Sequence, residues 1–408
     1  MLSPARVRLA LLALALGGFG IGCTEFVAMG LLPDLARDLL PGVYARSTAQ
    51  ANGQAGSLIA AYALGVVVGA PTIAALSARF ARKRLLLVLL AVVTVATVAS
   101  ALLPTFESVL VARFVAALPH GAYFGVAALV AASLLGPGKR GRGAAFVIGG
   151  LTIANIVGVP AITWLGQNAG WRIAYLAVAA IFVLTFVAVA LVVPRQPGDP
   201  GSTLRAELRA FRRPQLWFAL GIGSIGFSGL FAVYTYVSPI ATDVTGLPVS
   251  AVPLLLVVFG VGMTIGNFAG GWFTDRGTKR ALLTAFAGIL AALVALLLTV
   301  TTAVGLFACC LVLGAAVGGG AIAIQVRLLD VAGDSQTLAA ALNHSALNIG
   351  NTLGAALGGA VVAAGLGYVA PIGVGLALSA AGVLIALVSF GLEARTRRRG
   401  ALDLAGPE

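Results

Sequence analysis

The chain has 408 residues, of which 60% are hydrophobic and only 10% are charged, and its formal net charge is +13. Its mean hydropathy of +1.05 lies far above that of a soluble globular domain, so the composition excludes that class and predicts a protein of the lipid bilayer. A positive charge of this size would suggest nucleic-acid binding in a soluble protein, but here the basic residues gather in short loops on one side of the predicted membrane, which gives that function no support.

Apolar runs follow one another along the chain, each near or above the roughly 20 residues that cross a hydrocarbon core. Short segments with Arg, Pro, Gly or Asp separate them, and these are too short to hold a soluble domain. The predicted fold class is therefore all-α integral membrane, with twelve transmembrane helices at about 9–32, 56–77, 85–103, 108–135, 144–166, 173–193, 216–240, 251–274, 281–302, 304–326, 338–363 and 368–392.

The basic residues predict the orientation. Of the 26 Lys and Arg residues, all but Arg37, Arg46, Arg113 and Arg172 fall on the side of the N-terminus, so the positive-inside rule predicts a multi-pass cell-membrane protein with both termini in the cytoplasm. The alternative for the first apolar run is a secretory signal, which would leave eleven spans. All three cysteines lie within predicted spans, so we expect no disulfide framework.

Residues 194–215 form the longest polar and Pro/Gly-rich stretch, PRQPGDPGSTLRAELRAFRRPQ. It predicts a cytoplasmic linker with a short surface helix at 203–212. Six spans lie on each side, so we expect an N-terminal bundle at 1–193 and a C-terminal bundle at 216–408 that ends in a basic cytoplasmic tail.

The two halves repeat one pattern. The loop AALSARFARKR after the second span has a counterpart, GGWFTDRGTKR, after the eighth. Small residues also recur at every fourth position, a spacing that lets helices approach closely, although a chain with 53 glycines can produce it by chance. These stripes are Ala61, Gly65 and Gly69; Gly150, Ala154 and Gly158; Gly262, Gly266 and Gly270; and Gly350, Gly354 and Gly358.

The twelve spans, the repeat and the loop with Asp275, Arg276 and Lys279 resemble the major facilitator superfamily. The first loop keeps Arg79 of the family signature, but Ala78 stands at its acidic position. The resemblance implies that these loops control a cytoplasmic gate. It also implies two six-helix bundles around a central cavity, with spans two, five, eight and eleven meeting at the boundary, so we expect the small-residue stripes there.

Two further motifs narrow the resemblance. LVARFVAALPHGAYFG, with Arg113, resembles the Arg-bearing fourth-helix motif, and GGLTIANIVGVP, with Gly158 and Pro160, is similar to the antiporter motif, although Val159 separates its Gly-Pro pair. With TEFVAMGLLPDLARDL in the first span, the chain looks most similar to twelve-span drug:proton antiporters of the arabinose-efflux and chloramphenicol-resistance type.

Ionisable residues within spans are functional candidates, because an unpaired charge near the bilayer centre costs roughly 2.5 to 3.5 kcal/mol. Four are present, Glu25, Arg113, His120 and His344. Glu25 and Arg113 lie at similar depth, so we expect them to face each other or to share a water. Burial favours the neutral acid and a nearby guanidinium favours the carboxylate, so Glu25 is predicted to carry the proton. The alternative is a fixed ion pair that braces two helices.

Asp34, at the outer mouth, is either a second proton-coupling acid or a solvated loop residue. The remaining polar residues of the spans either contact a substrate or bond neighbouring helices. The predicted cavity set is His120, Tyr123, Asn155, Ser224, Ser228, His344, Asn348 and Asn351.

The function predicted is secondary active transport, with proton-coupled efflux of a small organic molecule such as a drug, sugar or related metabolite. An importer or facilitator with the same fold is the alternative, and an integral-membrane enzyme or a receptor is a weaker one, since no H-E-x-x-H or G-x-S-x-G motif is present. We expect no metal site and no cofactor, a proton gradient as the driving force, and a monomer whose partners are its substrate, protons and the bilayer.

Overall fold

The computed structural model describes residues 3–77, 80–136, 140–197, 212–332 and 336–404. Arg79, most of the predicted linker and nearly all of the surface helix expected at 203–212 lie outside the described residues. The described part of the chain is helical, and it contains no strand.

The helices of the first half are α1 (Pro4–Gly30), α2 (Leu32–Leu39), α3 (Pro41–Tyr44), α4 (Thr48–Ser77), α5 (Arg82–Leu102), α6 (Phe106–Ala117), α7 (Pro119–Leu135), α8 (Arg140–Ile153), the π-helical η1 (Ala154–Gly158), α9 (Val159–Ala169) and α10 (Trp171–Val192). Those of the second half are α12 (Pro214–Gly221), η3 (Ile222–Gly226), α13 (Phe227–Tyr234), α14 (Val237–Pro239), η4 (Ile240–Val244), η5 (Val249–Ala251), α15 (Val252–Arg276), α16 (Thr278–Thr299), α17 (Ala303–Ala332), α18 (Gln336–Ala363) and α19 (Ala370–Leu404).

Within the described ranges, twelve helical segments are long and apolar enough to cross a membrane, and each overlaps one predicted span. The helix ends differ from the prediction. The first helix begins at Pro4 because the Ser3 hydroxyl accepts a hydrogen bond from the N–H of Arg6 and proline suits the first helical position. The last helix runs to Leu404, since the charged residues after the apolar run are good helix formers.

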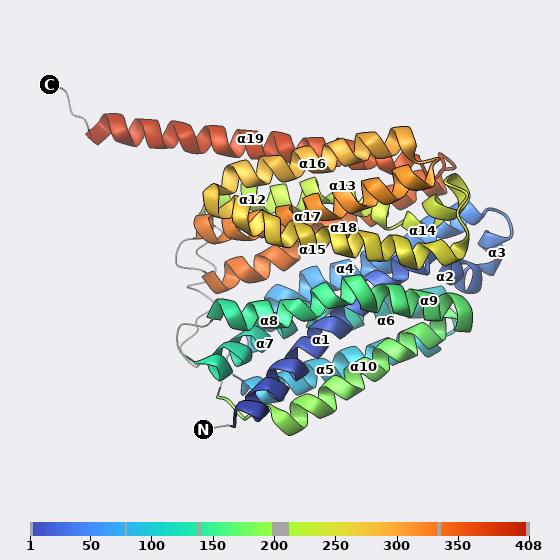
Figure 1. Cartoon of the computed structure of the whole chain (residues 1–408), viewed down its shortest axis with the longest axis horizontal. Coiled ribbons are helices and arrows are strands. Elements are labelled where there is room, and N and C mark those ends of the chain that lie inside the picture. The colour runs from blue at the N-terminus through green and yellow to red at the C-terminus, as the bar shows by residue number, and fades with distance from the viewer. Residues whose placement is uncertain (1–2, 78–79, 137–139, 198–211, 333–335, 405–408) are drawn as a thin grey trace.

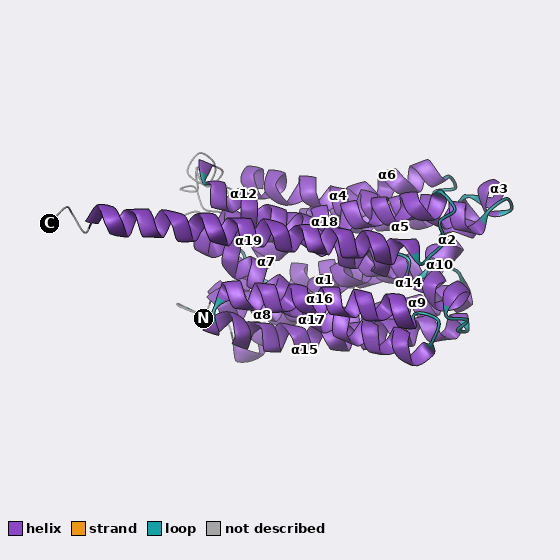
Figure 2. Cartoon of the chain, turned by 90° about the horizontal axis from the view of Figure 1, so that it is seen from above, coloured by secondary structure: helices purple, strands orange, loops and turns teal. Residues whose placement is uncertain are grey.

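Two helical bundles lie side by side, one made by the helices up to α10 and the other by those from α12 onward (Figure 1). Figure 2 shows that the described elements are helices joined by loops. Both ends of the chain lie at the same end of the molecule, which we call the termini end. The short helices α2, α3 and α14 lie at the opposite end, the loop end. The all-α fold with two bundles is thus confirmed.

A proline lies beside each of two π-helical turns, η1 within a crossing segment and η4 outside the twelve crossing segments, near the loop end. In η1 the N–H of Val159 bonds the carbonyl of Ala154, five residues back, directly before Pro160, which has no N–H to offer. In η4 the N–H of Thr245 likewise bonds the carbonyl of Ile240, just after Pro239. A π-helical turn shifts the register of the side chains that follow it, so the helix face changes within one span.

The small-residue stripes pack within each bundle, so the expectation that they line the boundary between bundles is wrong. The helix pairs are α4 on α6, α8 on α1, α15 on α17, and α18 on α13. In each pair a methyl group on a stripe glycine would collide with a carbonyl oxygen of the partner helix: Gly65 with Phe114, Gly150 with Ala15, Gly266 with Ala315, and Gly354 with Ser228.

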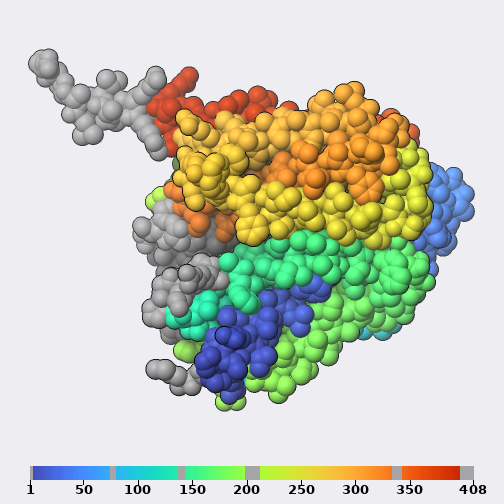
Figure 3. Space-filling model, in the orientation of Figure 1, coloured from blue at the N-terminus to red at the C-terminus, as the bar shows by residue number. Residues whose placement is uncertain are grey.

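The same four spans nevertheless meet at the boundary, as expected, through other residues. Helix α18 packs along α4, where Gly53 lies against the backbone of Gly359. Helix α15 packs on η1 and α9, where Gly260 lies against the carbonyl of Asn155. Figure 3 shows α15 lying against α8 and α9 along the middle of this face.

Two neighbouring glycines of α8 test this packing. Gly150→Ala is expected to lower stability by about 1–3 kcal/mol, because its methyl group must displace α1. Gly149→Ala would meet no atom within 4 Å, so it is expected to be neutral or stabilising by up to about 1 kcal/mol. Thermal unfolding of both variants in detergent checks this, and equal midpoints would contradict the stripe packing.

Candidate functional site

Arg113 is the most buried charged side chain at the centre of the N-terminal bundle, with 1% of its surface exposed. Its Nη1 atom donates to the carbonyl oxygen of Thr24 at 2.9 Å and to the Thr24 hydroxyl at 3.1 Å. The guanidinium carbon lies 4.3 Å from the ring centre of Tyr62 and 5.4 Å from that of Tyr175. Backbone and aromatic faces therefore stabilise the cation and join α1, α4, α6 and α10.

Glu25 follows Thr24 on α1, so the peptide that Arg113 binds is the one before the acid. The Glu25 side chain is buried, with 6% exposed. No hydrogen bond or ion pair within 4 Å involves its carboxyl group among the described residues, although Arg113 acts on it electrostatically. Nε and Nη2 of Arg113 also have no hydrogen-bond partner there. The structure thus brings the two residues together without the fixed ion pair of the alternative hypothesis.

The two histidines meet across the boundary between the bundles. His120 of α7 and His344 of α18 have ring centres 5.9 Å apart, and Phe124 lies beside both. Phe124 stacks on His344 with ring centres 5.3 Å apart and an interplanar angle of 10°. Nδ1 of His120 lies 3.4 Å from the Tyr62 hydroxyl, so this ring cluster adjoins the aromatic face that covers Arg113.

Polar groups of α18 extend the buried site into the C-terminal bundle. Asn351 is 1% exposed, and neither its amide oxygen nor its nitrogen has a hydrogen-bond partner among the described residues. Asn348 donates to the carbonyl of His344 at 3.1 Å, whereas its amide oxygen has no such partner. Unpaired buried amides are costly, so these groups are available to bind a polar solute.

Other members of the predicted cavity set serve helix packing in this structure. The Tyr123 hydroxyl donates to the carbonyl of Leu14 and ties α7 to α1. The hydroxyls of Ser224 and Ser228 bond carbonyls one turn back in their own helix, where the α18 stripe packs. Asn155 is buried in η1, and its backbone faces α15.

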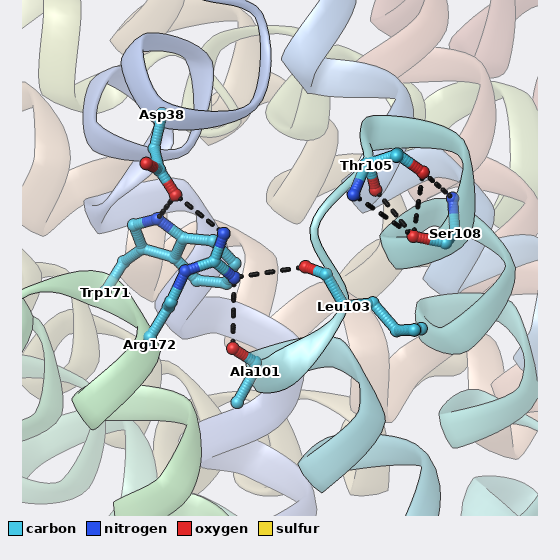
Figure 4. A network of polar contacts seen from close by, with 7 residues as sticks. All are labelled: Asp38, Ala101, Leu103, Thr105, Ser108, Trp171 and Arg172. Atoms are coloured by element: carbon cyan, nitrogen blue, oxygen red, sulfur yellow. Dashed lines mark hydrogen bonds and ion pairs between the residues drawn. The ribbon is translucent and has the colours of Figure 1, made fainter.

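Asp34 and Asp38 of α2, near the loop end, differ in their partners. Asp34 is half-buried, and burial raises its pKa, an effect that Arg37 at 3.8 Å partly offsets. Asp38, which the sequence analysis missed, accepts a hydrogen bond from the Trp171 indole and pairs with Arg172 at 2.9 Å (Figure 4). The GWR segment therefore fastens α10 to α2 at this end.

The residues of the second loop that were predicted to act at a gate lie at the termini end. Asp275 is exposed and makes no hydrogen bond or ion pair among the described residues. The guanidinium carbon of Arg276 lies 3.4 Å from the ring centre of Trp272. Lys279 instead pairs with Glu393 at 3.0 Å, and Glu393 also binds Arg327. Gly158 lies in η1 with Phe19 and Cys23 beside it, and Pro160 is the second residue of α9.

Several residues of the site were missed from the sequence. Phe124 lies one turn after His120, and Tyr62 is the single tyrosine of its span, so both could have been found as aromatic neighbours of a charged group. Glu393 and Arg327 directly follow the ends of predicted spans, so the sequence suggested solvent-exposed residues at helix ends. No group of three or more His, Cys, Asp or Glu residues suited to a metal occurs among the described residues.

A bundle of bilayer-crossing helices that holds an acid, a guanidinium and unpaired amides in its interior is suited to passing polar solutes, which defines a multi-pass membrane transporter. The chain belongs to the Major Facilitator Superfamily, whose family model matches residues 14–336 and 235–403. It is accordingly a transporter of small molecules and not an enzyme.

Relatives and a solved structure agree with this assignment. The chain is 38% identical to the inner membrane transport protein YdhP of Escherichia coli (strain K12), over 89% of this chain and 91% of that protein. It is 33% identical to the chloramphenicol resistance protein of Streptomyces lividans, over 88% and 90%. The crystal structure of a D-xylose-proton symporter covers 93% of this chain and 97% of its own, with a TM-score of 0.72 and 17% identity, which shows a shared fold.

The contact between the histidines can be tested by crosslinking. In a background without Cys23, Cys309 and Cys310, the double variant His120→Cys/His344→Cys is expected to react with a short bifunctional thiol reagent, because the native rings touch. The crosslink should stop transport, and reductant should restore it. Each single variant is the control. Full transport by the crosslinked protein would contradict movement of the bundles at this contact.

Proposed function

We propose that the chain is a proton-coupled exporter that exchanges a small organic molecule for protons. The observation that carries the proposal is the Glu25 carboxyl group, buried within a crossing helix, beside a guanidinium that binds the neighbouring peptide and not the acid itself. The chloramphenicol resistance protein among the relatives supports efflux of a drug-like molecule.

The proposed cycle assigns one role to each group. Glu25 takes up a proton when the site opens to the outside and releases it when the site opens to the cytoplasm. Arg113 provides a positive charge for the ionised acid, and its unpaired Nε and Nη2 atoms allow it to bind a substrate or a water in the same place. Substrate and proton then compete, so the inward proton gradient drives export without any cofactor.

The substrate is proposed to lie at the boundary between the bundles. The rings of His120, Phe124 and His344 offer flat apolar contact, and Asn348 and Asn351 offer amide groups. Such a set suits a small amphipathic molecule with an aromatic or sugar-like ring. The positive-inside pattern supports placing the termini end in the cytoplasm.

Glu25→Gln tests the carrier role in proteoliposomes with an imposed pH gradient, first with chloramphenicol and then with a panel of drugs, sugars and nucleobases. The variant is expected to lose uphill transport and substrate-induced proton movement, because an amide cannot titrate. It should keep downhill exchange, because the site remains. Glu107→Gln, an exposed acid on α6, is the matched control.

Three outcomes decide between the alternatives. Gradient-driven transport by Glu25→Gln at the wild-type rate would refute the proton-carrier role. Accumulation in right-side-out vesicles under an inward proton gradient would identify an importer. Loss of uphill transport in Asp34→Asn as well would add the loop-end acid to the proton path.

A further inference from the structure

A groove of about 780 Å³ opens at the termini end of the C-terminal bundle, away from the buried site. The end of the linker, the α15–α16 turn, α17 and α19 all contribute to it. Six basic side chains line it, against two acidic ones: Arg212, Arg213, Arg276, Lys279, Arg280 and Arg327 face Asp330 and Glu393. A concave surface with this excess of positive charge attracts an anion.

The base of the groove holds a cation that is only partly neutralised. Arg327 is 5% exposed, and its Nη2 atom donates to Glu393 at 2.9 Å and to Gln215 at 3.0 Å. The same Glu393 oxygen also pairs with Lys279 at 3.0 Å, so one carboxylate serves at least these two cations. Nε of Arg327 has no hydrogen-bond partner among the described residues, although it is buried. A buried guanidinium with an unpaired donor adds to the positive potential of the groove.

A helix N-terminus adds further donors to the groove. Helix α16 begins at Thr278, directly after Gly277, which has no side chain to cap the helix start. The first N–H groups of a helix have no partner within it, and the helix dipole places partial positive charge there. The residues of this turn, from Gly277 to Arg280, line the groove. Backbone donors and basic side chains together form the usual setting for a phosphate group.

The position of the groove indicates where the phosphate comes from. Trp272 and Phe273, in the last turn of α15, are 53% and 46% exposed. Tryptophan is enriched at the level of the lipid headgroups, so Trp272 at the end of a crossing helix marks that level. Arg276 lies over the Trp272 ring and also lines the groove, so the groove is at that level.

We propose that this groove binds the phosphate of an anionic phospholipid headgroup. The lipid would draw Arg212 and Arg213, at the end of the linker, to the start of α16 and to Arg327. A lipid of this kind would therefore fix the second half of the chain at one membrane surface. The site is independent of proton coupling, and its test does not require a transport substrate.

Lipid retention and thermal stability of the purified full chain test the proposal. Native mass spectrometry is expected to show retained phosphatidylglycerol but no retained phosphatidylcholine, and phosphatidylglycerol should raise the unfolding temperature. Arg280→Gln and Arg212→Gln should each weaken phosphatidylglycerol binding about fivefold, as expected for one basic residue at an anionic surface. Arg84→Gln is the matched control, because Arg84 is an exposed arginine at the start of α5, outside the groove.

Other results would overturn the proposal. If millimolar inorganic phosphate or glycerol phosphate stabilises the protein equally and displaces the lipid, the ligand is a free phosphate. If Arg84→Gln loses lipid as strongly as the two groove variants, the binding is diffuse surface charge and there is no site. Each variant is first measured without lipid, so a folding defect in Arg280→Gln is separated from lost binding, and Arg212→Gln provides an independent answer.

Discussion

The structure depends on close approach of helix backbones in a solvent that supplies neither water nor hydrogen bonds. Lipid tails are as apolar as leucine side chains, so burial alone does not drive helices together in the bilayer, and contact area must come from packing. In this chain the packing is made by glycines that face carbonyl oxygens of a neighbouring helix. The pairs of the two halves correspond, since α4 on α6 matches α15 on α17, and α8 on α1 matches α18 on α13.

That rigid frame makes a buried cation possible. Arg113 is held by a backbone carbonyl and by two aromatic rings, which come from helices already fixed by packing. Its charge is thereby stabilised without a salt bridge to a carboxylate of the described residues. Glu25 can then lie next to a positive charge while keeping its oxygens free of hydrogen bonds within the described chain, an arrangement in which an acid can exchange a proton with its surroundings.

The sequence was sufficient for the number, type and approximate limits of the crossing helices, because the length and hydropathy of an apolar run are enough to identify a segment that crosses the hydrocarbon core. It also placed Glu25, Arg113 and His120 inside the protein, and His344 is partly buried, since ionisable residues cannot face lipid cheaply. The sequence did not predict which helices and side chains contact one another. Residue spacing does not show which helix a glycine stripe faces, nor that the Tyr123 hydroxyl donates a hydrogen bond to the carbonyl of Leu14. Both depend on the rotation of each helix about its axis.

The boundary between the halves is built differently along its length. Toward the loop end, backbone lies against backbone where Gly53 meets Gly359, and Asn52 donates to the Tyr368 hydroxyl at 2.6 Å. Closer to the termini end, the bundles touch through the side-chain rings of His120, Phe124 and His344. Side chains can swing aside at little cost, whereas interlocked main chains cannot, so the first place where this molecule can part is on the side of its own termini.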